Sequence, residues 1–331
     1  MNRRWPDEAV DFGEAVGASL ARLGGVEFTR RAEADPSLRE SELRPALEQL
    51  GFHEIDVLGS PADAMAAALA ARAAGAVVAP WPVAAQLAAP LGADSPPAVY
   101  AAAGPLTRLE HLDLFESAAA VDLETRASVR VAPLGAVRSM PLDPFGVPCQ
   151  TLEANGSGAA DPTLARALDA HTVLIAYYVL GALEVATDLA AQYAGERVQF
   201  GQPIAQFGAI QWRLSEVVVA RDGLVELAGD ALWRFTEGIA TPADTLALRL
   251  GMLEAAHLVL AQTHQVFGAI GLCEEHDVTV IDRHLQPLLR RPAGTVASSK
   301  LLRDQILAHG FDGLFSIAPK GVARPQAEVN G

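Results

Sequence analysis

The residues best suited to chemistry stand close together in E-R-V-Q-F-G-Q-P-I-A-Q-F-G-A-I-Q, residues 196–211. Arg197 offers a planar guanidinium fork that suits a phosphate or pyrophosphate, Gln199 offers an amide, and Phe200 offers an aromatic face. Pro203 fits the first turn of a helix, where its missing N–H costs nothing. On spacing alone the stretch also fits a plain corner between two helices that carries a surface arginine.

A second polar run, Q-V-F-G-A-I-G, spans residues 265–271 and is followed by E-H-D. The Gln265 amide and the backbone N–H groups around Gly268 and Ala269 can hold anionic oxygens. The same spacing also fits a glycine-terminated helix with a polar end. Four histidines in this half of the chain suggest a metal site, but their separations of 7, 12 and 8 residues do not make same-face i,i+4 pairs, so we expect none. They are His257, His264, His276 and His284.

Composition and motif searches exclude several other classes of function. The formal net charge of −15, with no Lys/Arg-rich block to offset it, argues against nucleic acid as a partner. G-x-S-x-G, P-loop and G-x-G-x-x-G patterns are absent, and the two cysteines form no C-x-x-C. The N-terminus reads as no signal peptide, and no stretch reads as a membrane span. We expect a cytoplasmic protein that binds no membrane.

The elements that must position these residues are mostly helical, because half of the residues are hydrophobic and only 6% are aromatic. Helical periodicity predicts a long helix over 163–199, a second over 203–237, a third over 241–269 that is capped by T-P-A-D, and two more near 278–289 and 296–308. The N-terminal part predicts helices over 6–23, from 35 to 51, 60–74 and 83–89. Between these two parts, 99–102, 118–123, 128–133 and 136–139 predict short strands.

We therefore expect a mainly α protein with a reduced β middle section. The predicted domains are an N-terminal helical domain (1–92), a shortened β domain (93–160), a C-terminal four-helix-type bundle (161–312) and a tail (313–331). N-G-S-G at 155–158 predicts a linker.

The run R-V-Q-F-G-Q-P-I closely resembles a signature of the C-terminal domain of acyl-CoA dehydrogenases, FAD enzymes that desaturate acyl-CoA thioesters. The run at 265–271 is similar to a second signature of that family, although Ala269 replaces a glycine, and G-A-V-V-A-P-W-P near residue 80 is similar to the end of its N-terminal domain. The resemblance implies that FAD is bound across a subunit interface. The implied cofactor-binding residues are Arg197, Gln199, Phe200, Gln265, Gly268 and Ala269.

The chain departs from the family where the chemistry occurs. The middle section is short and lacks the two runs that contact the flavin ring, and Gly208 replaces a glutamine. The family's catalytic glutamate precedes Gly-Thr near the C-terminus, where this chain has Ala293, or lies early in the long helix, where it has Ala170-His171-Thr172. A methyl group cannot abstract a proton, so the resemblance implies no catalytic residue of this chain's own.

The resemblance therefore implies the smaller, non-catalytic subunit of an actinobacterial α2β2 acyl-CoA dehydrogenase. Its partner would be a homologous catalytic subunit that binds the acyl-CoA, and some such enzymes act on lipid or steroid side-chain thioesters. Two alternatives remain open at this stage. One is a self-sufficient acyl-CoA dehydrogenase with an unrecognised base, and the other is a flavin-free helical scaffold subunit.

Overall fold

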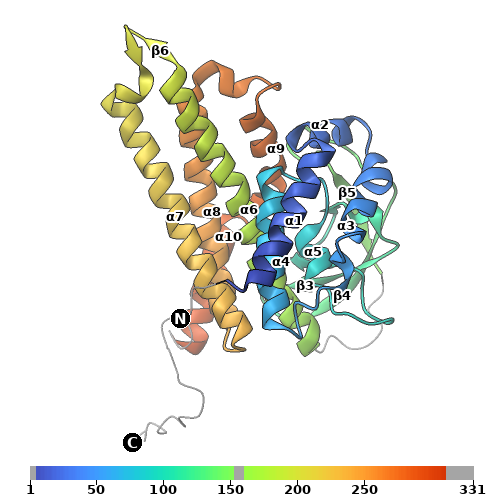
Figure 1. The fold of residues 1–331 in the computed structure, drawn as a ribbon. Helices are drawn as coiled ribbons and strands as arrows, with labels where there is room; N and C mark the ends of the chain where they lie inside the picture. Colours follow the sequence, from blue (N-terminus) through green and yellow to red (C-terminus); the bar gives the residue numbers. More distant parts are fainter. Residues whose placement is uncertain (1–4, 153–159, 311–331) are drawn as a thin grey trace, which may run out of the picture.

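The computed structural model describes residues 5–152 and 160–310. The first residues of the expected N-terminal domain, the expected linker at 155–158 and the expected tail at 313–331 lie outside the described residues. Within the described part, helices dominate and a small five-stranded sheet packs beside them, which confirms the expected fold class (Figure 1).

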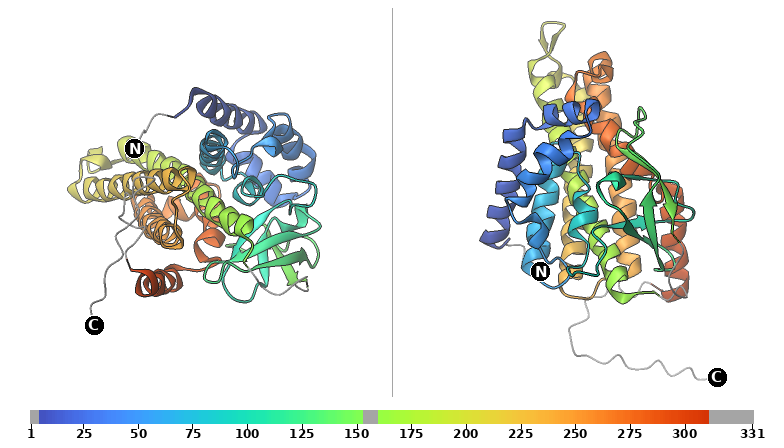
Figure 2. Two further views of the ribbon diagram at one scale, coloured as in Figure 1. Left: turned by 90° about the horizontal axis from the view of Figure 1, so that it is seen from below. Right: turned by 90° about the vertical axis from the view of Figure 1, so that its right-hand side faces the viewer.

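The N-terminal helices form one layer against the bundle (Figure 2). Ser60 caps the N-terminus of α4, accepting a hydrogen bond from the Asp63 N–H at 3.2 Å, as its sequence indicates. One helix was not expected: Gly24 and Gly25 end α1 with positive φ, but the chain begins a new helix directly after them because Phe28 and Ala32 bury one face. The helices are α1 (Asp7–Leu23), α2 (Val26–Ala34), the π-helical turn η1 (Arg39–Leu43), α3 (Arg44–Glu48), α4 (Pro61–Ala76) and α5 (Val83–Leu87).

The middle section forms a five-stranded sheet of order β1-β3-β4-β5-β2, in which β1 and β3 are parallel and the other pairs antiparallel. The strands are β1 (Val99–Ala102), β2 (Arg108–Glu110), β3 (Ala118–Asp122), β4 (Ser128–Pro133) and β5 (Gly146–Thr151). The strand expected at 136–139 is wrong. That segment lies in the β4–β5 connection, where the Arg138 N–H bonds to the Gly146 carbonyl at 3.0 Å. Two strands were missed: β2 is only three residues long, and β5 does not alternate clearly between apolar and polar residues.

The bundle consists of α6 (Pro162–Glu196), α7 (Gly208–Thr236), α8 (Pro242–Phe267), α9 (Asp277–Arg290) and α10 (Thr295–His309). Asp161 caps α6, and Thr241 caps α8 as expected, where it forms a capping box with Asp244. The expected start of the second long helix at Pro203 is wrong. A hairpin of β6 (Val198–Gln199) and β7 (Gln202–Pro203) intervenes, because Phe200 and Gly201 at φ +50° and +82° make a two-residue hairpin turn.

Helix α6 runs through the middle of the molecule and packs on α4, α7 and α8 (Figures 1 and 2). A Cβ on Gly75 would lie 1.8 Å from the Tyr178 carbonyl oxygen, and one on Gly181 would lie 1.9 Å from the Arg72 carbonyl oxygen. The backbones of α4 and α6 are therefore in direct contact, and one hydrophobic cluster joins the N-terminal helices to the bundle.

By length and composition α6 could cross a membrane, contrary to the expectation that no stretch reads as a span. However, 72% of its most apolar window is buried inside the protein. Burial of this extent is typical of the core helix of a packed bundle, which explains its composition without a bilayer.

Candidate functional site

Arg197, Gln199 and Phe200 lie at the outer end of the bundle, where α6 passes into the β6–β7 hairpin (Figure 1). All three side chains are exposed, and that of Phe200 is 93% exposed. Among the described residues, the Arg197 guanidinium and the Gln199 amide have no side-chain hydrogen bond or ion pair. A strongly exposed aromatic ring beside unengaged donors is typical of a surface that binds something.

Gln265, Gly268 and Ala269 lie at the end of α8 and the start of the short helix η5 (Gly268–Leu272), and all three are exposed. Gly268 has φ +62° and ψ −136°, a conformation open almost only to glycine, and a Cβ there would meet nothing within 4 Å. The backbone at Gly268 is therefore open to close approach by a ligand.

Packing brings the two predicted motifs together. The ring of Tyr193, four residues before Arg197, lies 5.0 Å from the ring of Phe267, two residues after Gln265. The structure thus places both motifs at the same end of the bundle (Figure 1). The two motifs form one exposed surface there.

The His264 side chain on α8 is hydrogen-bonded to the backbone of helix η5. The His264 Nδ1 bonds to the Gly271 carbonyl at 2.8 Å, which the Thr279 hydroxyl also reaches at 2.9 Å. The other ring nitrogen lies 3.3 Å from the Asp282 carboxylate, and this interaction raises the pKa of His264 although partial burial opposes it. His264, when protonated, therefore ties η5 to both α8 and α9.

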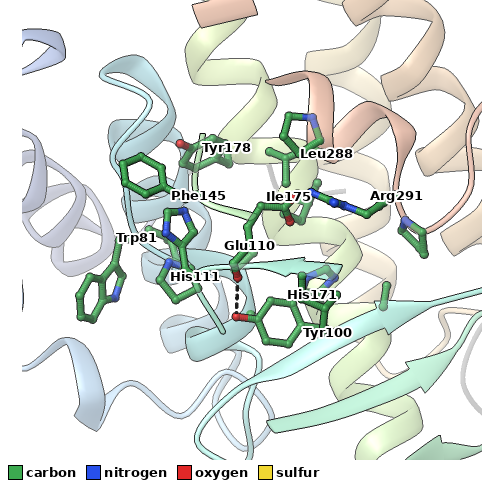
Figure 3. A pocket seen from close by; sticks show the side chains of 18 of the residues that line it. Trp81, Tyr100, Glu110, His111, Phe145, His171, Ile175, Tyr178, Leu288 and Arg291 are labelled. Atoms are coloured by element: carbon green, nitrogen blue, oxygen red, sulfur yellow. Dashed lines mark hydrogen bonds and ion pairs between the residues drawn. The ribbon is translucent and has the colours of Figure 1, made fainter. Parts of the chain in front are cut away.

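A cavity of about 80 Å³ lies between the N-terminal helices, the sheet and the bundle (Figure 3). Its walls are mainly apolar and include Trp81, Val83, Phe145, Ile175 and Leu288. Its polar lining residues are Tyr100, Glu110, His111, His171, Thr172, Tyr178, Arg249, His284 and Arg291. An apolar pocket with a few convergent polar groups is the usual form of a small-molecule site.

Glu110 contributes the carboxylate in this lining. It pairs with Arg291, whose guanidinium also binds Asp143 at 3.0 and 3.1 Å. Arg108 completes the cluster through Asp143. The carboxylate that could serve as a base is therefore engaged in a half-buried ion-pair network.

His171 lies in the cavity wall beside Tyr100 (Figure 3), and the two ring centroids are 6.4 Å apart. Only 8% of His171 is exposed, and its Nδ1 has no hydrogen-bond partner. Burial, with the nearby Arg249 charge, lowers the pKa of His171 to about 3, so the ring is neutral at physiological pH.

Ala293, which stands where the family resemblance expects a glutamate, is 3% exposed and packs in an apolar cluster with Val99, Val121 and Leu168. Its carbonyl accepts hydrogen bonds from Arg249 Nε and Nη2 at 3.0 and 2.6 Å. The residue is therefore tied into the core by its backbone.

Arg249, Glu110 and Arg291 were missed by the sequence analysis. Arg249 stands alone within the apolar run L-A-L-R-L-G-M, and Glu110 within a three-residue strand. A charge inside an apolar helix was the available signal for Arg249. Glu110 and Arg291 lie 181 residues apart, and their pairing depends on the tertiary fold.

Comparison with known proteins covers both the bundle that carries the exposed motifs and the part of the chain that encloses the cavity. Residues 162–295 match the family model described as acyl-CoA dehydrogenase, C-terminal domain. The chain is similar in structure to a chain of the ChsE4–ChsE5 complex from Mycobacterium tuberculosis, with TM-score 0.69 and 18% identity over 93% of this chain and 99% of that one. It is also similar to glutaryl-CoA dehydrogenase from Mycobacterium smegmatis, with TM-score 0.73 and 17% identity over 91% of this chain and 95% of that one. A third similar structure is the Tcur3481–Tcur3483 steroid ACAD, with TM-score 0.73 and 16% identity over 91% of this chain and 98% of that one.

Proposed function

We propose that this protein is the smaller, non-catalytic subunit of a heteromeric acyl-CoA dehydrogenase, since residues 162–295 match the acyl-CoA dehydrogenase C-terminal domain model and the chain shares the fold of solved acyl-CoA dehydrogenases. The observation that carries the proposal is that the candidate cofactor-binding residues and the cavity lie in two separate regions. Unengaged donors cluster on an exposed end of the bundle, while the buried cavity offers no free carboxylate.

The exposed end fits half of an FAD site. The Arg197 fork can donate two parallel hydrogen bonds to a pyrophosphate, and the Gln199 and Gln265 amides can donate further ones. Gly268 has no Cβ and open space lies beside it, so an anionic group can approach the backbone there closely. FAD would supply hydride acceptance, and the partner subunit would supply the flavin-ring contacts and the base.

The partner we propose is a homologous catalytic subunit in an α2β2 assembly, which binds the acyl-CoA in its own site. Two of the similar structures are named as two-component assemblies, ChsE4–ChsE5 and Tcur3481–Tcur3483, and the latter is called a steroid ACAD. We propose a lipid or steroid acyl-CoA thioester as the substrate and the cytoplasm as the setting. Large exposed apolar side chains on the bundle, Phe200, Trp212, Val219 and Leu272, support a surface that a partner covers.

Co-expression with a catalytic acyl-CoA dehydrogenase subunit from the same organism tests the proposal. We expect one complex with equal numbers of both chains, bound FAD, and acyl-CoA-dependent reduction of an artificial electron acceptor. The isolated chain should show no turnover with added FAD. Turnover by the isolated chain would overturn the proposal. A complex with the partner that is colourless and binds no added FAD would favour a flavin-free scaffold.

A self-sufficient dehydrogenase is the second candidate, because Glu110 places one carboxylate in the cavity wall near His171. If Glu110 were the base, Glu110→Gln would abolish turnover by the isolated chain. The matched control is Glu48→Gln on the exposed face of α3. Our proposal expects both variants to behave as the inactive isolated wild type.

A further inference from the structure

The cavity between the sheet and the bundle carries an unbalanced buried cation. Arg249 is 4% exposed, and among the described residues it forms no ion pair, although the charge of Glu110 acts on it at longer range. Its Nε and Nη2 bind the carbonyls of Leu288, Arg291 and Ala293, which caps the C-terminal end of α9 and the following turn. None of these hydrogen bonds uses Nη1, although Arg249 lines the cavity.

The charges around the cavity do not cancel. Three guanidinium groups (Arg108, Arg249, Arg291) and two carboxylates (Glu110, Asp143) lie around the cavity. Their charges sum to one net positive charge. The neighbouring pairs Arg39–Asp113 and Arg283–Glu33 are each neutral. The histidines add no charge, because burial lowers the pKa of His111, His171 and His284. A buried net charge without a counter-ion is costly, so this wall favours a monoanion.

A second group points to the same ligand. His171 is more than nine-tenths buried, lines the cavity and leaves Nδ1 without a partner. Its neutral ring has one N–H donor and one acceptor, and which nitrogen carries the proton is free to follow the ligand. A carboxylate could therefore accept one hydrogen bond from Arg249 Nη1 and another from the imidazole.

We propose that this cavity binds a small free monocarboxylate with a short apolar tail. The walls formed by Trp81, Phe145, Ile175 and Leu288 suit the tail (Figure 3). The volume of about 80 Å³ is roughly half that of an engineered cavity of ~150 Å³ that holds the six carbons of benzene, so it encloses a carboxylate and the first carbon atoms of its tail. The cavity is partly open, so the end of a tail of three or four carbons can extend out of it. An uncharged thioester carbonyl would leave the net charge unmatched. The inference is independent of the proposed function, since it requires neither FAD nor a partner subunit.

The test measures binding of butyrate, butyramide and inorganic phosphate to the full-length chain by calorimetry. Butyrate should bind at least about 10-fold more tightly than butyramide, which keeps the shape but lacks the charge, and phosphate should not bind because it lacks the tail. Butyrate binding should also shift the His171 ring signals in NMR spectra, assigned by their loss in His171→Phe. Equal binding of butyrate and butyramide, absence of butyrate binding, or phosphate binding at least as tight as that of butyrate would each overturn the proposal.

Variants locate the site. Arg249→Met and His171→Phe should each weaken butyrate binding by about 10-fold or more, while Arg303→Ala, which removes an exposed arginine on α10, should not change it. If Arg249→Met fails to fold, the ligand series on the wild type and the His171→Phe variant still decide the outcome. Unchanged affinity in His171→Phe would place the butyrate elsewhere and overturn the assignment.

Discussion

Arg197 carries the proposed cofactor contact, and its exposed, unengaged guanidinium makes it a direct test at the residue scale. Arg197→Ala should weaken FAD binding to the co-purified complex by roughly 1.5–3 kcal/mol, since charge-assisted hydrogen bonds to an anion are lost. Arg197→Lys keeps the charge but not the fork, so we expect a smaller loss. The measurement is the FAD dissociation constant, with Arg303→Ala as the control. Unchanged FAD affinity in Arg197→Ala would contradict the cross-subunit site.

Ala293 cannot be converted into a base by substitution alone. Its methyl group packs in an apolar cluster, so Ala293→Glu would bury a carboxylate and lower the free energy of unfolding by more than about 2 kcal/mol at neutral pH. Ala293→Gln separates the effect of size from that of charge. The introduced carboxyl should have a raised pKa, so its charge penalty should shrink as the pH falls below that pKa. Chemical denaturation at several pH values measures this, and equal stability of the Glu and Gln variants at neutral pH would show that position 293 accepts a charge.

At the scale of the elements, the direct contact of α4 with α6 depends on glycine. Gly75→Ala places a Cβ against the Tyr178 backbone oxygen, and because two helix backbones would have to separate, we expect a loss of about 3 kcal/mol or more. Gly195→Ala in α6 is the matched control, since a Cβ there meets nothing within 4 Å. That control should be neutral or stabilise by up to ~1 kcal/mol through helix propensity. Thermal unfolding compares them, and similar melting temperatures for both variants would contradict the close packing.

Helix η5 should show a pH dependence that comes from His264. The pKa of His264 is raised in the folded state by Asp282, so the stabilisation is fully present below the unfolded pKa and is lost as the pH rises through the folded one. His276 and Arg290 also face this pair and remain unchanged in a His264 variant. The difference in melting temperature between wild type and His264→Gln should therefore shrink from about pH 6 to pH 8. A difference that is constant or grows across this range would exclude the ion pair as its source.

At the scale of the whole molecule, the exposed end of the bundle should govern assembly. Phe200→Asp places a charge where the partner would bury an aromatic ring, so it should weaken the hetero-complex by ~2 kcal/mol or more and leave the isolated chain's stability within about 0.5 kcal/mol. Leu134→Asp, at another exposed apolar residue near the sheet, is the control. Sedimentation velocity of mixtures with the partner gives the result, and a complex insensitive to Phe200→Asp would place the interface elsewhere.

The sequence by itself determined the helical class, the bundle and the position of its motifs. Local signals were sufficient there: caps such as Thr241 and Asp161 act within a few residues, and the apolar period of α6 is continuous. The same local signals failed at the Pro203 corner and at strands β2 and β5. In those places a two-residue turn and pairing between distant segments outweigh helix propensity and alternation.

Only the tertiary structure decided which residues come together at the two motifs and in the cavity. Tyr193 and Phe267 bring two runs, some 65 residues apart, to one end of the bundle, and Arg249, His171 and Glu110 meet in one cavity from α8, α6 and β2. No local pattern encodes these meetings, because each depends on how close α4 and α6 approach and on where the sheet packs. The charges and pKa shifts that distinguish the cavity arise from burial, which is a property of the fold and not of any segment.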